Sequence, residues 1–162
     1  MELGFKRLFG RRPAEETARD RRARKRVPPG PEDSVLIVDD SRTAVHVLKS
    51  MLEQSGFTTY VATDGETGVR LAREIRPGLI LMDIVMPGIN GFQATRLIRK
   101  DPVTRRIPVI LISGNQQVTE EVWGRRLGAN DFLAKPIQRG VLFAKVEALL
   151  GLRQPADHPG PA

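Results

Sequence analysis

Five short apolar runs, separated by longer amphipathic stretches, are the feature that most limits how this chain can fold. The runs lie at residues 35–39, 58–62, 79–83, 107–112 and 131–134. Three of them are nearly continuous in Val, Ile and Leu, which is typical of parallel strands whose two faces are both covered. The stretches between them repeat apolar residues at helical spacing, as in the face made by Val45, Leu48, Met51 and Leu52. The pattern therefore predicts a strand–helix unit repeated five times.

Signals for helix ends agree with this division. Ser41, Asp64 and Asn90 stand where the N-caps of the first three helices are expected. Gly56 and Gly128 stand where helices should end. Repeated strand–helix units imply right-handed crossovers, so we predict an α/β fold with a doubly wound, five-stranded parallel sheet. We expect the flavodoxin-like strand order 2-1-3-4-5.

The positive charge of the chain is concentrated at its N-terminus. The net charge is +7, and residues 1–31 carry ten Lys or Arg against four Asp or Glu. Residues 11–33 hold almost nothing to bury and close with a Pro-rich run, so we expect them not to fold on their own. We predict a basic, flexible extension over residues 1–33, a single domain over 34–152 and a C-terminal tail over 153–162.

Composition and hydropathy favour a cytoplasmic protein. The chain has no Cys, its apolar runs are far shorter than the roughly 18 residues of a spanning helix, and its N-terminus lacks the apolar core of a signal peptide. Apolar and basic residues within 1–26 could contact an anionic membrane surface. We expect no nucleic-acid partner, because no interleaved aromatic residues and no nucleic-acid-binding motif accompany the basic run.

Three acids follow the first and third predicted strands. In a doubly wound sheet, ligands bind beyond the carboxyl ends of the strands, here beside strands 1 and 3. Asp39, Asp40 and Asp83 should therefore converge. Crowded carboxylates destabilise a fold unless a cation joins them, and oxygen ligands with positions left for water suit Mg²⁺. Asp39 and Asp40 alone would be interpreted as caps of the next helix, but Asp83 at the matching strand end favours a metal site.

Ser113 and Lys135 follow the fourth and fifth predicted strands. A hydroxyl and an ammonium at the same edge of the sheet can bind the oxygens of a phosphoryl group placed on Asp83. Singly, Ser113 would be a turn residue and Lys135 a solvated charge. Their coincidence with the acids, at four of five strand ends, favours the functional interpretation. Pro136 allows a cis peptide bond after Lys135, although the trans form is more common.

Four strings, VLIVDDS, LILMDIVMPGINGFQATRLI, IPVILISG and GANDFLAKP, resemble in this order the receiver domain of two-component response regulators. The resemblance covers residues 34–151. It implies that Asp83 accepts a phosphoryl group from the phosphohistidine of a sensor histidine kinase. It also implies that Mg²⁺ is the cofactor and is bound by Asp39, Asp40, Asp83 and the backbone carbonyl of Val85.

The same resemblance assigns the remaining roles. It implies that Ser113 and Lys135 hold the phosphoryl oxygens and that Phe132 occupies the switch-aromatic position, where Tyr is common. Such a protein is a phosphoacceptor and not an enzyme, apart from its own phosphotransfer and slow autodephosphorylation. It would signal to an unknown downstream protein through its fourth helix, fifth strand and fifth helix.

A finer resemblance links the chain to stand-alone regulators of type IV pilus, or twitching, chemosensory systems. It rests on MDIVMPGINGFQATR and VWGRRLGANDFLAKP, and on the pair Trp123 and Gly124 in particular. Packing of the fourth helix is the alternative explanation of Trp123. A phosphate sink or a phosphorelay intermediate in another pathway remains an alternative function.

Functions of other classes fit less well. A phosphohydrolase with an aspartyl-phosphate needs a second acid two residues after its nucleophile, where this chain has Val85. A mononucleotide binder needs a phosphate-cradling loop after the first strand, where Asp39 and Asp40 would repel the phosphate. A scaffold with a vestigial site would not retain the complete set of acids, hydroxyl and lysine.

Overall fold

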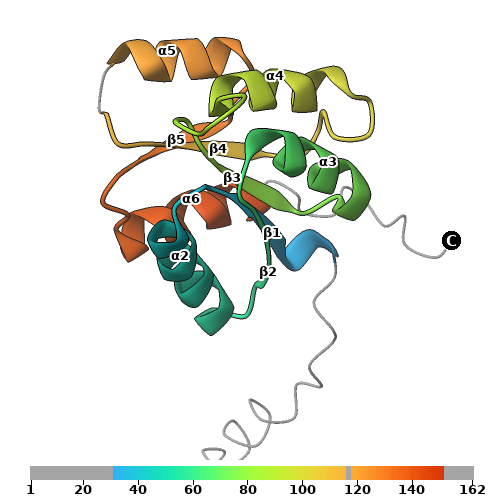
Figure 1. Cartoon of the computed structure of the whole chain (residues 1–162). Helices are drawn as coiled ribbons and strands as arrows, with labels where there is room; N and C mark the ends of the chain where they lie inside the picture. Colours follow the sequence, from blue (N-terminus) through green and yellow to red (C-terminus); the bar gives the residue numbers. More distant parts are fainter. Residues whose placement is uncertain (1–30, 116–117, 152–162) are drawn as a thin grey trace, which may run out of the picture.

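A five-stranded parallel sheet organises the computed structural model, which describes residues 31–115 and 118–151. Its strand order is β2-β1-β3-β4-β5, as predicted (Figure 1). The elements in chain order are η1 (Pro31–Asp33), β1 (Ser34–Val38), α2 (Arg42–Gln54), β2 (Thr58–Ala62), α3 (Gly65–Ile75), β3 (Leu79–Asp83), α4 (Gly91–Lys100), β4 (Val109–Ser113), α5 (Val118–Arg126), β5 (Asp131–Ala134) and α6 (Arg139–Gly151).

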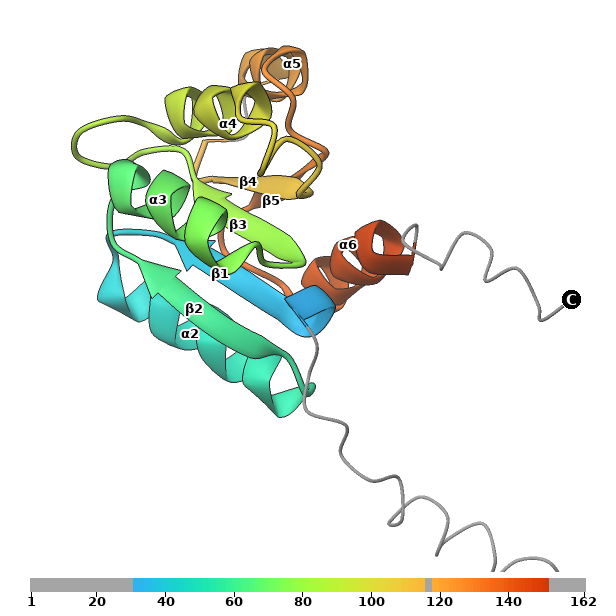
Figure 2. The ribbon, with the colours of Figure 1, turned by 90° about the vertical axis from the view of Figure 1, so that its right-hand side faces the viewer.

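Helices cover both faces of the sheet. The views in Figures 1 and 2 place α3, α4 and α5 on one face and α2 and α6 on the other. Each face has its own apolar core: alternate residues of β1 and β3 contact α3 and α4 on one side, and the intervening residues contact α2 and α6 on the other. All residues of β1, β3 and β4 are buried. This two-sided burial explains why those runs lack the alternation of a half-exposed strand.

The predicted helix ends are confirmed. Ser41 accepts a hydrogen bond from the backbone N–H of Ala44, and Asp64 accepts one from Thr67. Asn90 and Gln93 form a reciprocal capping box at the start of α4. Gly56 and Gly128, just beyond α2 and α5, have φ angles of 92° and 102°. Only a residue without Cβ adopts such angles at little cost, so both helices end there.

Four predicted strand boundaries are wrong by one or two residues, and among them the first strand begins at Ser34 and not at Val35 while the fourth ends at Ser113 and not at Ile112. The first strand ends at Val38 and not at Asp39, because Asp39 already turns toward the following helix and accepts a hydrogen bond from the N–H of Ser41. The fourth strand begins at Val109 and not at Ile107, because Ile107 closes a turn by donating to the carbonyl of Thr104.

Trp123 does not pack into the helical layer. Its side chain is 58% exposed, and the guanidinium of Arg126 lies 6.0 Å from its ring centroid. The helix-packing explanation of this residue is therefore wrong. Its neighbour Gly124 is buried and contributes to packing instead, because it leaves room for the ring of Phe132 and the side chain of Leu111.

The predictions made for the two ends of the chain concern residues that lie mostly outside the described ranges. These are the basic extension over 1–33, with its membrane contact through 1–26, and the tail over 153–162; the limits of the domain between them stay a prediction. Within the described residues, no helix has both the length and the apolar character needed to cross a membrane.

Candidate functional site

The carboxyl ends of β1 and β3 bring three acids together. Val38 pairs with Met82 across these strands, so Asp39 and Asp83 come next to each other at the same edge of the sheet. One carboxylate oxygen from each of Asp39, Asp40 and Asp83 lies within 4.8 Å of the others. Asp39 and Asp83 are buried, and Asp40 is exposed. The cluster thus has one side closed by protein and one side open to a ligand.

Lys135 connects two of these acids from the end of β5. Its Nζ lies 3.1 Å from Oδ1 of Asp83 and 3.6 Å from Oδ2 of Asp39. Its backbone N–H donates to the carbonyl of Ser113, which extends the pairing of β4 with β5 and holds the lysine at the edge of the sheet. The peptide bond between Lys135 and Pro136 is cis.

The electrostatics of the site are those of a crowded acid cluster with one cation. Burial raises the pKa of Asp83, the charge of Asp39 raises it further, and Lys135 only partly offsets these effects. Burial lowers the pKa of Lys135, but the hydrogen bond and charge of Asp83, together with the charge of Asp39, outweigh it and leave that pKa above its ordinary value. Lys135 is therefore a cation at neutral pH, and Asp83 beside it gives up its proton less readily than a free aspartate.

A hard divalent cation fits this donor set. Oδ1 of Asp39 accepts the N–H of Ser41, the N-cap residue of α2, at 2.8 Å. Its other oxygen, Oδ2, is buried without a hydrogen-bond partner, and the 3.6 Å to Lys135 is an ion-pair distance beyond hydrogen-bond range. A buried, unpartnered carboxylate oxygen beside two further carboxylates is suited to Mg²⁺, which takes oxygen ligands only.

The loop after β3 approaches the site closely. The N–H of Gly91 donates to the carbonyl of Ile84 at 2.8 Å, and a Cβ at Gly91 would collide with the backbone carbonyl of Asp83. Glycine is therefore required where α4 begins. Val85, whose carbonyl is an expected metal ligand, lies in this loop two residues after Asp83, and its side chain is 76% exposed.

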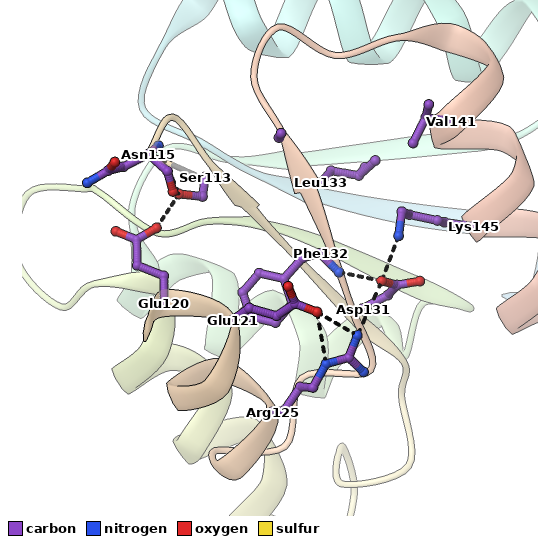
Figure 3. A pocket seen from close by; sticks show the side chains of 11 residues that line it. Ser113, Asn115, Glu120, Glu121, Arg125, Asp131, Phe132, Leu133, Val141 and Lys145 are labelled. Carbon is purple, nitrogen blue, oxygen red and sulfur yellow. Dashed lines mark hydrogen bonds and ion pairs between the residues drawn. The ribbon is translucent and has the colours of Figure 1, made fainter. Parts of the chain in front are cut away.

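Ser113 and Phe132 make contacts with residues other than the three acids. Ser113 is buried at the end of β4, and its hydroxyl contacts the backbone of Asn115 and the carboxylate of Glu120 on α5. Phe132 is partly buried and packs against the core under α4 and α5. Both residues line an open pocket of about 450 Å³ between α5, β5 and α6 (Figure 3).

Several residues of this pocket were not predicted from the sequence. Glu120 is one of them, and the residues of a chain of ion pairs across the pocket are the others. In that chain Asp131 contacts Lys145 at 2.7 Å and Arg125 at 4.0 Å, and Arg125 also contacts Glu121 at 3.0 Å (Figure 3). Only the spacing of Glu121 and Arg125, four residues apart on one helix, is visible in the sequence.

Comparisons with known proteins agree with this geometry. Residues 35–147 match the family described as the response regulator receiver domain. Protein PilH of Pseudomonas aeruginosa is 49% identical over 116 residues, which cover 72% of this chain and 96% of that protein. Response regulator PleD of Caulobacter vibrioides is 39% identical over 115 residues, which cover 71% of this chain but 25% of PleD.

Solved structures show the same fold. The receiver domain of the sensor histidine kinase PA1611 from Pseudomonas aeruginosa, which has a magnesium ion coordinated in its active-site cleft, superposes with a TM-score of 0.69 at 33% identity and covers 73% of this chain and 97% of that one. The signal receiver domain of a signal transduction histidine kinase from Syntrophus aciditrophicus gives a TM-score of 0.70 at 34% identity, with 80% and 98% covered.

Proposed function

Because the chain belongs to the response regulator receiver domain family, we propose that it accepts a phosphoryl group on Asp83 from a sensor histidine kinase. The observation that carries the proposal is the convergence of Asp83 with two further acids and with the ammonium of Lys135, 3.1 Å away. In the reaction, a carboxylate oxygen of Asp83 attacks phosphorus, the bond from phosphorus to the histidine nitrogen breaks, and the imidazole leaves with its electron pair.

Asp39, Asp40, Asp83 and the carbonyl of Val85 are the residues that would hold Mg²⁺. The bound ion would supply positive charge next to the phosphoryl oxygens, which is the main requirement of phosphoryl transfer. Asp39 contributes the unpartnered oxygen described above. Burial, together with the charges of Asp39 and Asp40, raises the pKa of Asp83, and a bound cation would stabilise the ionised carboxylate that the reaction needs.

Lys135 and Ser113 would bind the transferred group. Lys135 already contacts Asp83, so its ammonium stands where it can neutralise a phosphoryl oxygen. Ser113 would have to give up its present partners, Asn115 and Glu120, to donate its hydroxyl to that group. Phe132 lines the same pocket as Ser113 and is the residue whose ring would respond to this movement.

We further propose that the signal passes to a downstream protein by contact with the surface formed by α5, β5 and α6. The 49% identity with protein PilH supports a place in a type IV pilus chemosensory pathway. We expect the protein to act in the cytoplasm, with the basic residues of 1–26 as a contact for an anionic membrane surface. Hydrolysis of the phosphoryl group would be slow, and no other substrate would be turned over.

The test is phosphorylation by acetyl phosphate with Mg²⁺, followed by intact-protein mass spectrometry. Wild-type protein should gain one phosphoryl group, and both Asp83→Asn and addition of a chelator should prevent this. Asp33→Asn, which changes an exposed acid outside the site, is the matched control and should label like the wild type. Undiminished labelling of Asp83→Asn would refute the assignment. Repeated turnover of a phosphomonoester would favour the phosphohydrolase instead.

A kinase panel tests the pathway. Purified histidine kinases of the host, each labelled on histidine, are offered to the protein, and the rate of transfer to Asp83 is compared. We expect the kinase of a type IV pilus system to transfer fastest. Faster transfer from a kinase of another system would contradict the pilus assignment and leave the phosphoacceptor assignment intact.

A further inference from the structure

The hydroxyl of Ser113 is engaged on the side of α5. Its oxygen accepts the N–H of Asn115 at 3.0 Å, and it lies 2.6 Å from the carbonyl of Asn115 and in close contact with a carboxylate oxygen of Glu120 (Figure 3). A serine hydroxyl carries one proton, so the carbonyl and the carboxylate compete for it. The charged acceptor makes the stronger hydrogen bond, and Glu120 is therefore the main acceptor of that proton.

The position of Glu120 on α5 favours this contact. Glu120 is in the first turn of the helix, where the unpaired N–H groups stabilise a negative charge. Glu121, its neighbour, is also in the first turn but pairs with Arg125 at 3.0 Å. Two adjacent acids thus have different partners, and only Glu120 reaches the end of β4.

We propose that Glu120 is a positioning residue that holds the Ser113 hydroxyl toward α5 while Asp83 is unmodified, and so opposes phosphorylation. The inference rests on the proposed function, because it requires a phosphoryl group on Asp83 to claim the same hydroxyl. A phosphoryl group and Glu120 cannot both receive the single proton of Ser113. Binding of the group therefore frees the Glu120 carboxylate, which is then left without its serine partner in the pocket between α5, β5 and α6.

The competition has a measurable consequence for ligands that mimic the phosphoryl group. Beryllofluoride with Mg²⁺ binds an aspartate carboxylate in place of a phosphoryl group, and its fluorines accept hydrogen bonds. We expect Glu120→Gln and Glu120→Ala to bind beryllofluoride roughly tenfold more tightly than the wild type, since one charge-assisted hydrogen bond no longer has to be broken. Glu121→Gln is the matched control and should bind like the wild type.

Trp123 offers a direct signal. It is the only Trp of the chain, its side chain is 58% exposed, and it lies one turn beyond Glu120 on α5. Titrations of the full chain would follow its fluorescence, and ¹⁹F NMR of the bound fluorides would give a second readout of occupancy. Urea unfolding of each variant confirms that the proteins compared are folded.

A double-mutant cycle separates this role from a merely structural one. In the Ser113→Ala background no hydroxyl is left to hold, so Glu120→Gln should no longer change the affinity. A gain that persists in that background, or an unchanged affinity of Glu120→Gln in the wild-type background, would overturn the inference. Failure of the proposed function looks different, because the wild type would then bind beryllofluoride no better than Asp83→Asn.

Discussion

The ring of Phe132, on β5, fills the space that a side chain at Gly124, on α5, would need. A Cβ at Gly124 would collide with the ring and would lie 2.8 Å from Cδ1 of Leu111. The contact shows how closely α5 packs on the sheet beside Ser113, and it accounts for a glycine inside a nine-residue helix, where glycine is otherwise unfavourable.

Gly124→Ala should destabilise the protein. The added methyl must displace Phe132 or Leu111, and overpacking of this kind costs about 1–3 kcal/mol. Gly140→Ala in α6 is the matched control, because nothing lies within 4 Å of a Cβ there, and it should stabilise by roughly 0.5–1 kcal/mol. Urea unfolding measures both. Equal effects of the two substitutions would show that the ring yields without cost.

Asp83→Asn should make the metal-free protein more stable at neutral pH. Burial and the charge of Asp39 raise the pKa of Asp83, so the folded state holds that proton more tightly than the unfolded chain. The associated stability is present at low pH and is lost as pH rises through the raised pKa. The side-chain amide of Asn does not titrate, so the variant does not lose this stability as pH rises.

Urea unfolding in a chelator, at acid and at neutral pH, measures the effect of Asp83→Asn. The gain should shrink at acid pH, where the wild-type carboxyl is protonated as well. Addition of Mg²⁺ should stabilise the wild type more than the variant. A variant less stable than the wild type at neutral pH would mean that the ion pair with Lys135 outweighs the repulsion.

The stabilising contribution of Asp64, the N-cap of α3, should depend on pH in the acid range. The backbone N–H and the hydroxyl of Thr67 both hydrogen-bond to this carboxylate and lower its pKa. Its contribution to stability is therefore present above the unfolded-state pKa of about 3.9 and is lost as pH falls through the lower, folded-state value. Asp64→Asn keeps a cap but should weaken this part of the pH dependence.

Unfolding at a series of pH values tests the cap prediction. Asn90→Ala is the control, because it removes a neutral cap from α4; it should cost about 1 kcal/mol without changing the pH dependence. If the free energies of unfolding of Asp64→Asn and of the wild type fell equally steeply toward acid pH, the assignment of this pH dependence to Asp64 would be contradicted.

Arg99→Lys should cost about 2–3 kcal/mol although the charge is kept. The guanidinium donates to the carbonyls of Gly128 and Ile107, each at 2.7 Å, and to Oδ1 of Asn130 at 2.6 Å. An ammonium cannot reproduce this planar set of donors, so the part-buried carbonyls of Gly128 and Ile107 lose a donor. Arg96→Lys, at an exposed position of the same helix, should change the free energy of unfolding by less than about 0.5 kcal/mol.

Much of the fold could be predicted because each local signal has one structural meaning. The apolar runs are strands, three of them buried along their whole length, and Gly56 and Gly128 end helices as expected. The errors lie where two local structures compete. Asp39 continues the apolar run in sequence but accepts the N–H of the N-cap residue Ser41, and Ile107 looks like strand but closes a turn.

The sequence predicted which residues come together in the site, but it did not predict all the contacts that each of them makes. Asp39, Asp40 and Asp83 do converge, and Lys135 does reach Asp83. That Lys135 also lies 3.6 Å from Asp39, and that Ser113 contacts Glu120, could not be predicted. Glu120 has no distinguishing signal, since a charged residue in a first helical turn is ordinary.

The sequence by itself determined which polar residues stand at one edge of the sheet. Parallel strands bring all their carboxyl ends to that edge, and the position of each polar residue follows from its place after an apolar run. What only the tertiary structure decided is how α5 lies against that edge. The packing of Phe132 against Gly124 sets its approach, and this approach determines that Glu120, and not Glu121, meets the hydroxyl of Ser113. Such contacts depend on the distance and angle between packed elements, which the spacing of residues along a chain does not encode.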